Sequence, residues 1–315
     1  MARSLSIITV THQSSAVLPQ FVRAAAAAAP HSEIVIVDNA STDGGPNLVS
    51  AHPQVTVLAN NTNVGFGRAC NIGARYAAKG ILAFVNPDLW LSQVDVPPPG
   101  DFKPFGIAAG VMSDERGDPV SAISREPRRA AAWYREVFSP LAPRQLPPLR
   151  RRSQRRPGYV SGALCLVEAG EFQALGGFDE RFFLYHEDRD LGRRYRRAGL
   201  PVRHLTSVRG RHLHGSSTGA TTTVPGQAWS IVSWIEYVGI WEGSTAARNL
   251  ADRVLRRLSN MGTLLSESRA LVRSQRVSRK AAEYRQLHER VSAFPRYLPP
   301  EVPGFYPHAR AAILP

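Results

Sequence analysis

The sequence has few cysteines and no long apolar run, and both absences exclude classes of protein. Its 315 residues include two cysteines, Cys70 and Cys165, which lie far apart in the chain. That pattern argues against a disulfide framework and is typical of a reducing compartment. The best candidate for a membrane span, residues 228–241, is short and contains Glu236. The apolar run 7–10 is too short for a signal peptide, so we expect a cytoplasmic protein.

Acidic residues are scarce relative to basic ones. The chain has 39 Lys and Arg against 25 Asp and Glu, which gives a net charge of +14 and a pI near 10.6. Residues 144–157 contain six arginines and no acid, and residues 248–315 contain 13 Lys and Arg against five Asp and Glu. A solvated surface, nucleic acid, an anionic membrane face or a phosphate-rich substrate each fit this charge. No zinc-finger spacing or RNA-recognition signature supports nucleic acid.

The first ninety residues alternate between strand and helix patterns. Strands are predicted at 5–10, 33–37, 55–58 and 81–85, and helices at 16–29 and 65–79. This alternation predicts an α/β fold with a mostly parallel sheet and helices on both faces. Later strands are predicted at 106–112 and 201–208, with order returning at 159–167 and a charged helix at 187–198.

The C-terminal third has a different pattern. From residue 224 it is helical, with breaks predicted at Gly243 and Gly262. We therefore divide the chain into an α/β domain (1–219), a basic helical region (220–294) and a proline-rich tail (295–315). Residues 144–157 are predicted to form a mobile, arginine-rich loop within the first domain.

Polar clusters follow the first four predicted strands: 11–13, 38–39, 60–63 and 86–88. Parallel strands place their carboxyl ends at one edge of the sheet, where ligands bind in such folds. Four polar clusters at four strand ends favour one shared binding site over four solvated loops. Asp38 could accept hydrogen bonds from a ring N–H or a sugar hydroxyl, although by itself it could equally be an ordinary residue at a strand end.

Three further segments carry candidate ligand-binding groups. Gly65 stands at a loop-to-helix transition, where the backbone can approach a ligand closely, and Asn71 either faces that ligand or packs in the core. Asp88, after Asn86-Pro87, suits a hard divalent cation that bridges a diphosphate, or is an ordinary loop aspartate. His212 could be a metal ligand, a diphosphate contact or a solvated residue.

The segment 176–191 is the densest in functional groups. Glycines and aromatic residues precede Glu187, Asp188 and Asp190 at a helix start. Acidic residues there favour the helix N-terminus electrostatically. A carboxylate beside apolar walls could also have its pKa raised enough to act as a general base.

Together these segments resemble the inverting GT-A glycosyltransferases of family 2, and within that family the bacterial rhamnosyltransferase-like branch of envelope polysaccharide synthesis. The matching pieces stand in order at 8–14, 37–44, 61–67, 86–88 and 177–191, and the resemblance covers residues 4–219. The chain has His12-Gln13 where family members often have Tyr-Asn, and Asn86-Pro87-Asp88 in place of a D-x-D motif.

The resemblance implies a role for each matching residue. It implies Thr11 and Asp38 as nucleoside contacts, Asn63, Gly65 and Asn71 as the lining of the nucleotide pocket, Asn86 and Asp88 at the sugar-nucleotide diphosphate, Asp88 and His212 at a Mg²⁺ or Mn²⁺ ion, and Asp188 or Glu187 as the base. The base would deprotonate the acceptor hydroxyl in a single in-line displacement.

The branch suggests dTDP-L-rhamnose as donor and a polyprenyl-diphosphate-linked saccharide as acceptor. The alternative enzyme activity is a glycosyltransferase that uses a UDP-sugar donor such as UDP-galactofuranose. A nucleic-acid-binding protein and an inactive scaffold are remote alternatives. The basic helices could hold the protein at an anionic inner membrane face, and the loop 144–157 could close over a diphosphate.

Overall fold

The computed structural model describes residues 5–77, 80–96, 104–124, 158–213, 224–271 and 275–293. The expected loop 144–157 and tail 295–315 lie outside these ranges. The elements are β1 (Leu5–Thr11), α1 (Leu18–Ala28), β2 (Glu33–Asp38), η1 (Gly45–Leu48), β3 (Val55–Ala59), α2 (Phe66–Tyr76), β4 (Ile81–Val85), β5 (Leu89–Val94), β6 (Ile107–Ser113), β7 (Pro119–Val120), β8 (Ile123–Ser124), β9 (Tyr159–Val160), β10 (Leu164–Glu168), α4 (Ala169–Ala174), α5 (Glu187–Arg197), β11 (Val202–His212), α6 (Val224–Glu242), α7 (Ser244–Leu271) and α8 (Gln275–Ser292).

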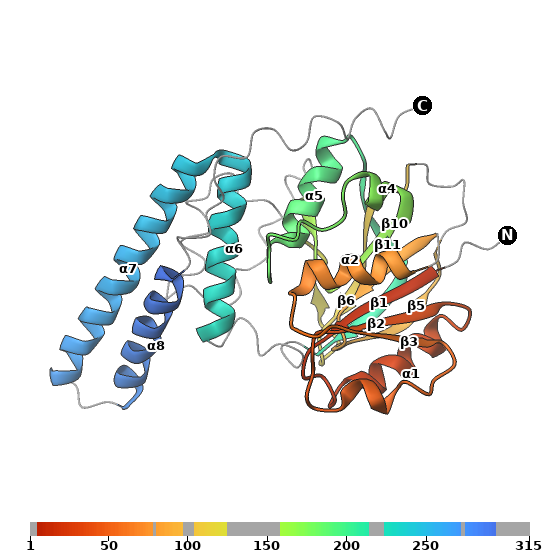
Figure 1. Cartoon of the computed structure of the whole chain (residues 1–315), viewed down its shortest axis with the longest axis horizontal. Coiled ribbons are helices and arrows are strands. Elements are labelled where there is room, and N and C mark those ends of the chain that lie inside the picture. The colour runs from red at the N-terminus through yellow and green to blue at the C-terminus, as the bar shows by residue number, and fades with distance from the viewer. Residues whose placement is uncertain are drawn as a thin grey trace.

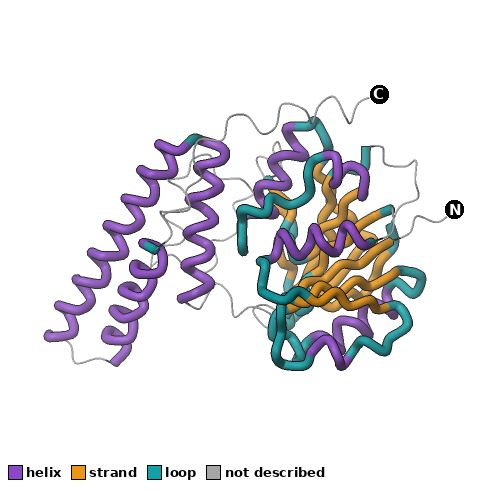
Figure 2. The backbone as a smooth tube through the Cα atoms, in the orientation of Figure 1, coloured by secondary structure: helices purple, strands orange, loops and turns teal. Residues whose placement is uncertain are grey.

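One nine-stranded sheet organises the first part of the chain, and a helical region stands beside it (Figures 1 and 2). The strand order is β3-β2-β1-β4-β10-β6-β11-β5, with β7 paired to β6. The first four strands are parallel, and their register places Thr11 opposite Asp38. β10 runs antiparallel to both β4 and β6, and β5 runs antiparallel to β11. The predicted α/β arrangement is confirmed, and the sheet as a whole is mixed.

The order in which the chain forms its strands decides which face of the sheet α1 and α2 each cover. It steps outward from β1 to β2 through α1 and then crosses back from β3 to β4 through α2. Right-handed crossovers in opposite directions put the two helices on opposite faces. Gly73 lets α2 lie close to the sheet, because a Cβ there would be 2.6 Å from Ile8 Cγ2.

The helical region α6–α8 has a core of its own, which includes Trp234, Val254 and Leu258. Phe182, from the loop before α5, is buried in this core rather than in that of the sheet. The predicted break at Gly243 is confirmed, with φ at +95° between α6 and α7. The predicted break at Gly262 is wrong, because α7 continues through it. A Cβ on Gly262 would lie 3.4 Å from Arg285 Cγ, so this glycine serves the close packing of α8.

Within the described ranges, no helix combines the length and the apolar character needed to cross a bilayer. The longest, α7, carries arginines throughout, including Arg248, Arg253 and Arg256.

Candidate active site

The carboxyl ends of β1 and β2 are joined by hydrogen bonds around Asp38. Its Oδ1 accepts from Thr11 Oγ1 at 2.9 Å and from Ser41 Oγ at 2.5 Å, and its Oδ2 accepts from the Ser41 backbone N–H at 3.0 Å. Asp38 and Thr11 are both buried. The carboxylate is therefore held in place and keeps capacity for one further donor on Oδ2. The nucleoside contact expected of these two residues stays a prediction.

Asn39 ties three strand ends together, and the sequence reasoning did not single it out. Its Nδ2 donates to the Gly65 carbonyl oxygen at 3.2 Å, and its Oδ1 accepts from Asn60 Nδ2 at 2.9 Å. Its own carbonyl oxygen lies 2.9 Å from His12 Nδ1. The sequence feature that could have indicated this role is an asparagine directly after a buried strand. When such a side chain is buried, both its NH2 group and its oxygen need hydrogen-bond partners.

The glycine-rich entrance to α2 packs against the segment 177–183. Gly65 has φ at +88°, and a Cβ there would lie 2.5 Å from the Phe183 carbonyl oxygen. That same oxygen accepts a hydrogen bond from the Phe66 backbone N–H at 2.8 Å. Asn63 Oδ1 accepts from the Gly65 N–H at 3.0 Å. At Gly65 the backbone closely approaches the protein's own Phe183. The approach to a nucleotide expected of Asn63 and Gly65 stays a prediction.

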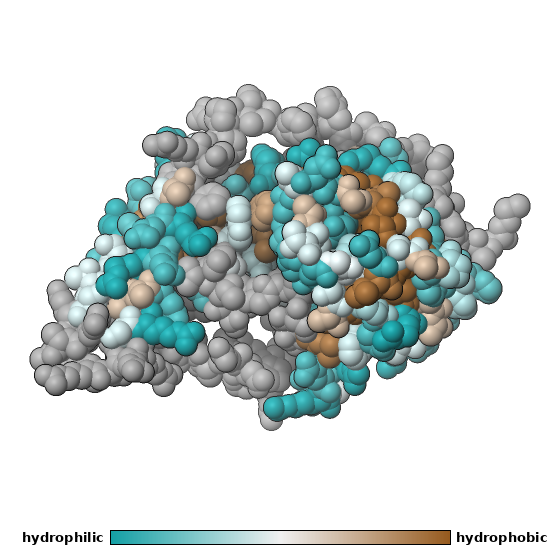
Figure 3. Space-filling view, turned by 60° about the horizontal axis from the view of Figure 1, so that its bottom comes forward, coloured by the Kyte–Doolittle hydropathy of each residue, from teal (hydrophilic) through white to brown (hydrophobic). Residues whose placement is uncertain are grey.

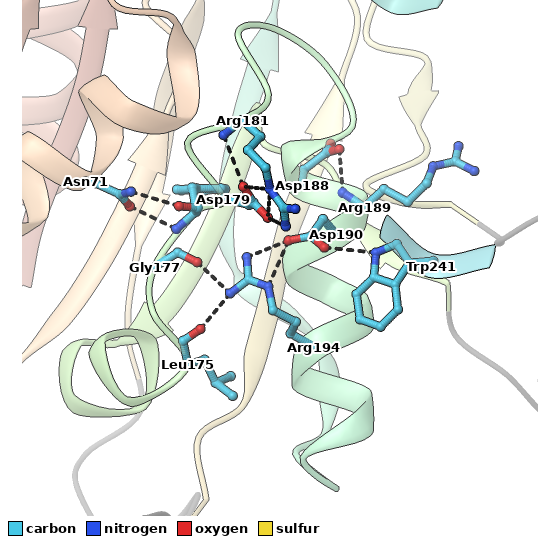
Figure 4. Close-up of polar contacts among 11 residues, drawn as sticks. Asn71, Leu175, Gly177, Asp179, Arg181, Asp188, Arg189, Asp190, Arg194 and Trp241 are labelled. Atoms are coloured by element: carbon cyan, nitrogen blue, oxygen red, sulfur yellow. Dashed lines mark hydrogen bonds and ion pairs between the residues drawn. The ribbon is translucent and has the colours of Figure 1, made fainter. Parts of the chain in front are cut away.

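Asn71 holds the start of the segment that carries the acidic cluster (Figure 4). Its Nδ2 donates to the Phe178 carbonyl oxygen at 2.8 Å and to Glu180 Oε1 at 3.1 Å, and its Oδ1 accepts from the Phe178 N–H at 2.9 Å. The side chain is buried and both ends of the amide are engaged. The structure thus displays the packing alternative for Asn71, and a contact with nucleotide stays a prediction.

Asp88, in the turn between β4 and β5, lies next to His212 at the end of β11. His212 Nε2 lies 3.3 Å from Asp88 Oδ1, and the Leu213 backbone N–H donates to the Asp88 carbonyl oxygen at 2.9 Å. Asp88 is buried. A carboxylate is a suitable ligand for Mg²⁺ or Mn²⁺, and an imidazole suits a transition metal such as Mn²⁺ better than Mg²⁺. Within the described residues no group of three or more His, Cys, Asp or Glu side chains is arranged so that it could hold a metal ion, so a cation held here would need further ligands from other sources.

A short turn at residues 161–163 connects the Asp88 region with the acidic cluster. The Asn86 backbone N–H donates to the Ala163 carbonyl oxygen at 3.1 Å. One residue earlier, the Gly162 N–H donates to Asp188 Oδ2, also at 3.1 Å. A Cβ on Gly162 would lie 3.4 Å from the Phe66 ring and 3.6 Å from Asp188 Cβ. The structure therefore brings Asn86, Asp188 and the start of α2 around one turn.

Glu187 and Asp188 are neighbours in sequence but have different surroundings. Glu187 is buried under α2, where a Cβ on Gly67 would lie 3.5 Å from Glu187 Cβ. Its Oε2 has no hydrogen-bond partner among the described residues. Asp188 is half-buried, and backbone N–H groups fix both of its oxygens, Oδ2 through Gly162 and Oδ1 through Arg189 at 2.7 Å. Asp188 is therefore the oriented and more accessible carboxylate of the two.

Burial has a large effect on both acids. It raises the pKa of Glu187 well above its usual range, and the charge of Asp188 raises it further, which favours the protonated form of Glu187. Burial also raises the pKa of Asp188. The N–H of Gly162 and the charge of Arg189 act in the opposite direction and favour the carboxylate.

Asp190, the third acid of the cluster, is part of a buried ion pair. Arg194 Nε and Nη2 lie 2.8 and 2.7 Å from Asp190 Oδ2, and both side chains are almost fully buried. Arg194 Nη1 also donates to the carbonyl oxygens of Leu175 and Gly177 (Figure 4). Trp241 Nε1 donates to Asp190 Oδ1 at 2.9 Å. Asp190 is thus a structural anchor that joins α5, the segment before it and α6.

Comparisons with known proteins relate this chain to glycosyltransferases. Residues 6–98 match the family model described as glycosyl transferase family 2. The chain is 29% identical over 242 residues to the N-acetylglucosaminyl-diphospho-decaprenol L-rhamnosyltransferase of Mycobacterium tuberculosis, which covers 70% of this chain and 79% of that protein. It is 22% identical over 209 residues to the low-salt glycan biosynthesis hexosyltransferase Agl10 of Haloferax volcanii, covering 64% of each chain.

Solved structures show the same fold. The crystal structure of GalNAc-T7 with UDP, GalNAc and Mn²⁺ matches with a TM-score of 0.55 at 14% identity. The match covers 95% of this chain and 59% of the other, so this chain spans under two thirds of that protein's length. The expected GT-A fold is confirmed. The chain contains a glycosyltransferase family 2 domain, and its relatives include a rhamnosyltransferase.

Proposed function

We propose that the enzyme transfers L-rhamnose from dTDP-L-rhamnose, with inversion, to a hydroxyl group of a polyprenyl-diphosphate-linked saccharide. The relative that acts on N-acetylglucosaminyl-diphospho-decaprenol supports this choice of donor sugar and acceptor, because the similarity covers most of both chains. The observation that carries the mechanism is the turn 161–163, which touches Asn86 on one side and Asp188 on the other. A base and a diphosphate site around one turn are what a single displacement requires.

Asp188 is the proposed base. Its carboxylate takes the proton from the acceptor hydroxyl as that oxygen attacks the anomeric carbon and the bond to the diphosphate breaks. The two backbone N–H groups orient the carboxylate before the acceptor arrives. Glu187 is excluded from this role in our proposal, because it is sealed beneath α2 and its raised pKa favours the protonated form.

Asp88 and His212 are the proposed metal-binding residues. A divalent cation bound there would neutralise the charge that develops on the departing nucleoside diphosphate. Thr11, Asp38 and Asn39 would line the nucleoside side of the pocket, at the ends of β1 and β2.

A donor screen tests the proposed substrates. We expect the purified protein to transfer rhamnose from dTDP-L-rhamnose to a synthetic lipid-linked N-acetylglucosamine diphosphate, and to lose this activity when EDTA is added. UDP-galactofuranose and UDP-hexoses should give much slower transfer under the same conditions. Product would be measured by mass spectrometry. Faster transfer from a UDP-sugar would replace rhamnose in the proposal, and full activity in EDTA would remove the metal from it.

We further propose that the helical region docks on an anionic membrane face, where a lipid-linked acceptor would lie. Arg248, Arg253 and Arg256 are exposed on α7, and in a space-filling view the helical region presents mainly hydrophilic residues (Figure 3). Arginines near an anionic surface each contribute about 1 kcal/mol to binding, and salt screens that attraction.

Vesicle sedimentation provides the measurement. The protein should pellet with phosphatidylglycerol-containing vesicles but not with phosphatidylcholine alone, and added salt should release it. The double variant Arg253→Gln, Arg256→Gln should bind more weakly, whereas Arg23→Gln, Arg116→Gln, which removes two exposed arginines from the sheet domain, should bind normally. Equal weakening by the two pairs would contradict a surface on α7.

A further inference from the structure

β3 stands at one end of the strand order of the large sheet, and in the described part of the chain only β2 pairs with it. Its sequence, Val-Thr-Val-Leu-Ala, is apolar apart from one threonine. In an α/β sheet such a run is typical of an inner strand, which is covered on both faces. None of the five residues is buried, however, whereas every residue of β4 is. β3 therefore has the sequence of an inner strand at an outer position.

The hydrogen bonds between β2 and β3 leave alternate backbone groups of β3 facing outward. The Ile34 N–H donates to the Gln54 carbonyl oxygen at 2.8 Å, just before the strand begins. The parallel register continues this pattern through Thr56 and Leu58, because every second residue of a strand faces the same neighbour. The N–H and C=O groups of Val57, at the middle of the strand, therefore point away from β2. Such outward groups form an edge on which another strand can pair.

β3 lacks the features that commonly keep an edge strand from pairing. Charged side chains, proline and β-bulges are the usual ones. Residues 44–67, which include β3, contain no Lys, Arg, Asp or Glu, and the strand itself contains no proline. Its register with β2 is continuous, without a bulge. At the opposite end of the strand order, α1 packs against β5. Among the described residues, β3 is thus the open edge of the sheet.

The outward groups of β3 are complementary to those of a second β3. Both the N–H and the C=O of Val57 face outward. A second copy that runs antiparallel about a two-fold axis at this residue can form two identical hydrogen bonds, one from each Val57 N–H to the C=O of the partner's Val57. The same axis places Val55 opposite the partner's Ala59. A contact in which a residue meets its own equivalent closes after two copies, so it yields a dimer rather than a filament.

The charge of the chain favours this edge over the basic surfaces as a contact between copies. Each copy carries a net charge of +14, so two copies repel each other wherever their basic surfaces meet. An uncharged edge brings no like charges face to face and requires no ionic group to lose its water. The half-buried side chains of Val55, Val57 and Leu58 would also lose contact with water, which favours association.

We propose that two copies of this chain associate through β3, which joins their sheets into one continuous sheet across a two-fold axis at Val57. The two sheets then run in opposite directions. The strand ends that carry Thr11 and Asp38 in each copy lie at opposite ends of the joined sheet, so each copy keeps its own set of site residues. This inference does not depend on the donor or the acceptor proposed above.

Sedimentation velocity of the full chain at several concentrations tests the proposed dimer. The wild type should sediment with about twice the 34.5 kDa mass of one chain. Val57→Pro should sediment as a monomer, because proline removes the outward N–H and its ring meets the incoming strand. The loss of two hydrogen bonds should raise the dissociation constant of the dimer by about tenfold or more. The fold should be retained, since the pairing with β2 does not use that N–H.

Val57→Thr is the matched control, because it keeps the backbone N–H and a branched side chain that suits a strand. It should form the dimer as the wild type does. If Val57→Pro does not fold, as judged by circular dichroism, Val57→Lys gives the same test. It keeps the backbone intact and places two like charges opposite each other at the axis, which should also produce a monomer.

The effect of salt separates this contact from an association driven by charge. Added salt should strengthen the dimer, because it screens the repulsion between two copies of charge +14, whereas it should release the protein from vesicles. A wild-type chain that stays monomeric at every concentration would overturn the inference. A dimer that persists unchanged in both Val57→Pro and Val57→Lys would overturn it as well, since the copies would then meet through another surface. Neither result bears on the proposed sugar transfer.

Discussion

Replacing Asp188 with asparagine is expected to lower kcat for sugar transfer by about 10²- to 10⁴-fold, the usual contribution of a general base. The amide keeps the shape of the side chain and can still accept a hydrogen bond from a backbone N–H, but it cannot take a proton from the acceptor. The donor does not need the base in order to bind, so its dissociation constant should change little. Initial rates and calorimetric titration of dTDP-rhamnose measure the two quantities separately.

Glu187→Gln is the matched control, one residue away and with the opposite expectation. Transfer should be largely retained, because Glu187 is buried and its raised pKa favours the uncharged form, which glutamine resembles. The buried Glu187 should also make the stability of the wild-type protein depend on pH in a defined direction. The folded state keeps a proton that the unfolded chain releases, so wild-type stability falls as pH rises from the ordinary range of a glutamate toward the raised pKa of Glu187.

Glutamine removes this fall. The difference in Tm between Glu187→Gln and the wild type should therefore grow in favour of the variant as the pH rises above the ordinary range of a glutamate. If Glu187→Gln loses transfer as severely as Asp188→Asn, the proposed division of roles between the two carboxyls is wrong.

Arg194→Met should destabilise the protein by about 3–5 kcal/mol, the usual result of removing one partner from a buried ion pair. The loss leaves the Asp190 carboxylate buried without its cation. It also leaves the carbonyl oxygens of Leu175 and Gly177 without the guanidinium that joins them. Urea unfolding followed by circular dichroism gives the change in free energy of unfolding.

The control is Arg279→Met on α8. Arg279 and Glu283 have the same i,i+4 spacing on a helix, with Nε and Oε1 at 3.5 Å, but the arginine side chain is 85% exposed. Solvent screens such a pair, so its loss should cost at most about 0.5 kcal/mol. Similar costs at the two sites would mean that the Asp190–Arg194 pair is not the anchor described above.

The first half of the sheet could be predicted from the sequence because its strands are apolar throughout and alternate with helices. The second half could not, because the antiparallel position of β10 between β4 and β6 depends on pairing between strands that are distant in sequence. The predicted helix break at Gly262 was wrong for a similar reason. A glycine inside a helix has the same sequence signature whether it ends the helix or admits a neighbouring one.

The sequence could predict the location of those site residues whose position is fixed by the strand that they belong to or follow. Asp38 and Asp88 follow buried strands, so their positions near one sheet edge could be expected. Which of Glu187 and Asp188 is sealed depends on how α2 packs over α5, and no local pattern records that. Arg189 and Trp234 lie 45 residues apart, and only the folded chain brings them together.

Phe182 in the helical core carries a consequence for how this protein can be divided and recombined. The boundary that the sequence predicts near residue 219 divides the chain into two regions, yet Phe182 and the Asp190–Trp241 hydrogen bond cross it in space. A fragment that ends there would expose the apolar ring of Phe182 and the aromatic support of α5. Chimeras with related enzymes should therefore exchange the loop before α5, α5 and α6 as one unit, because these elements pack on one another.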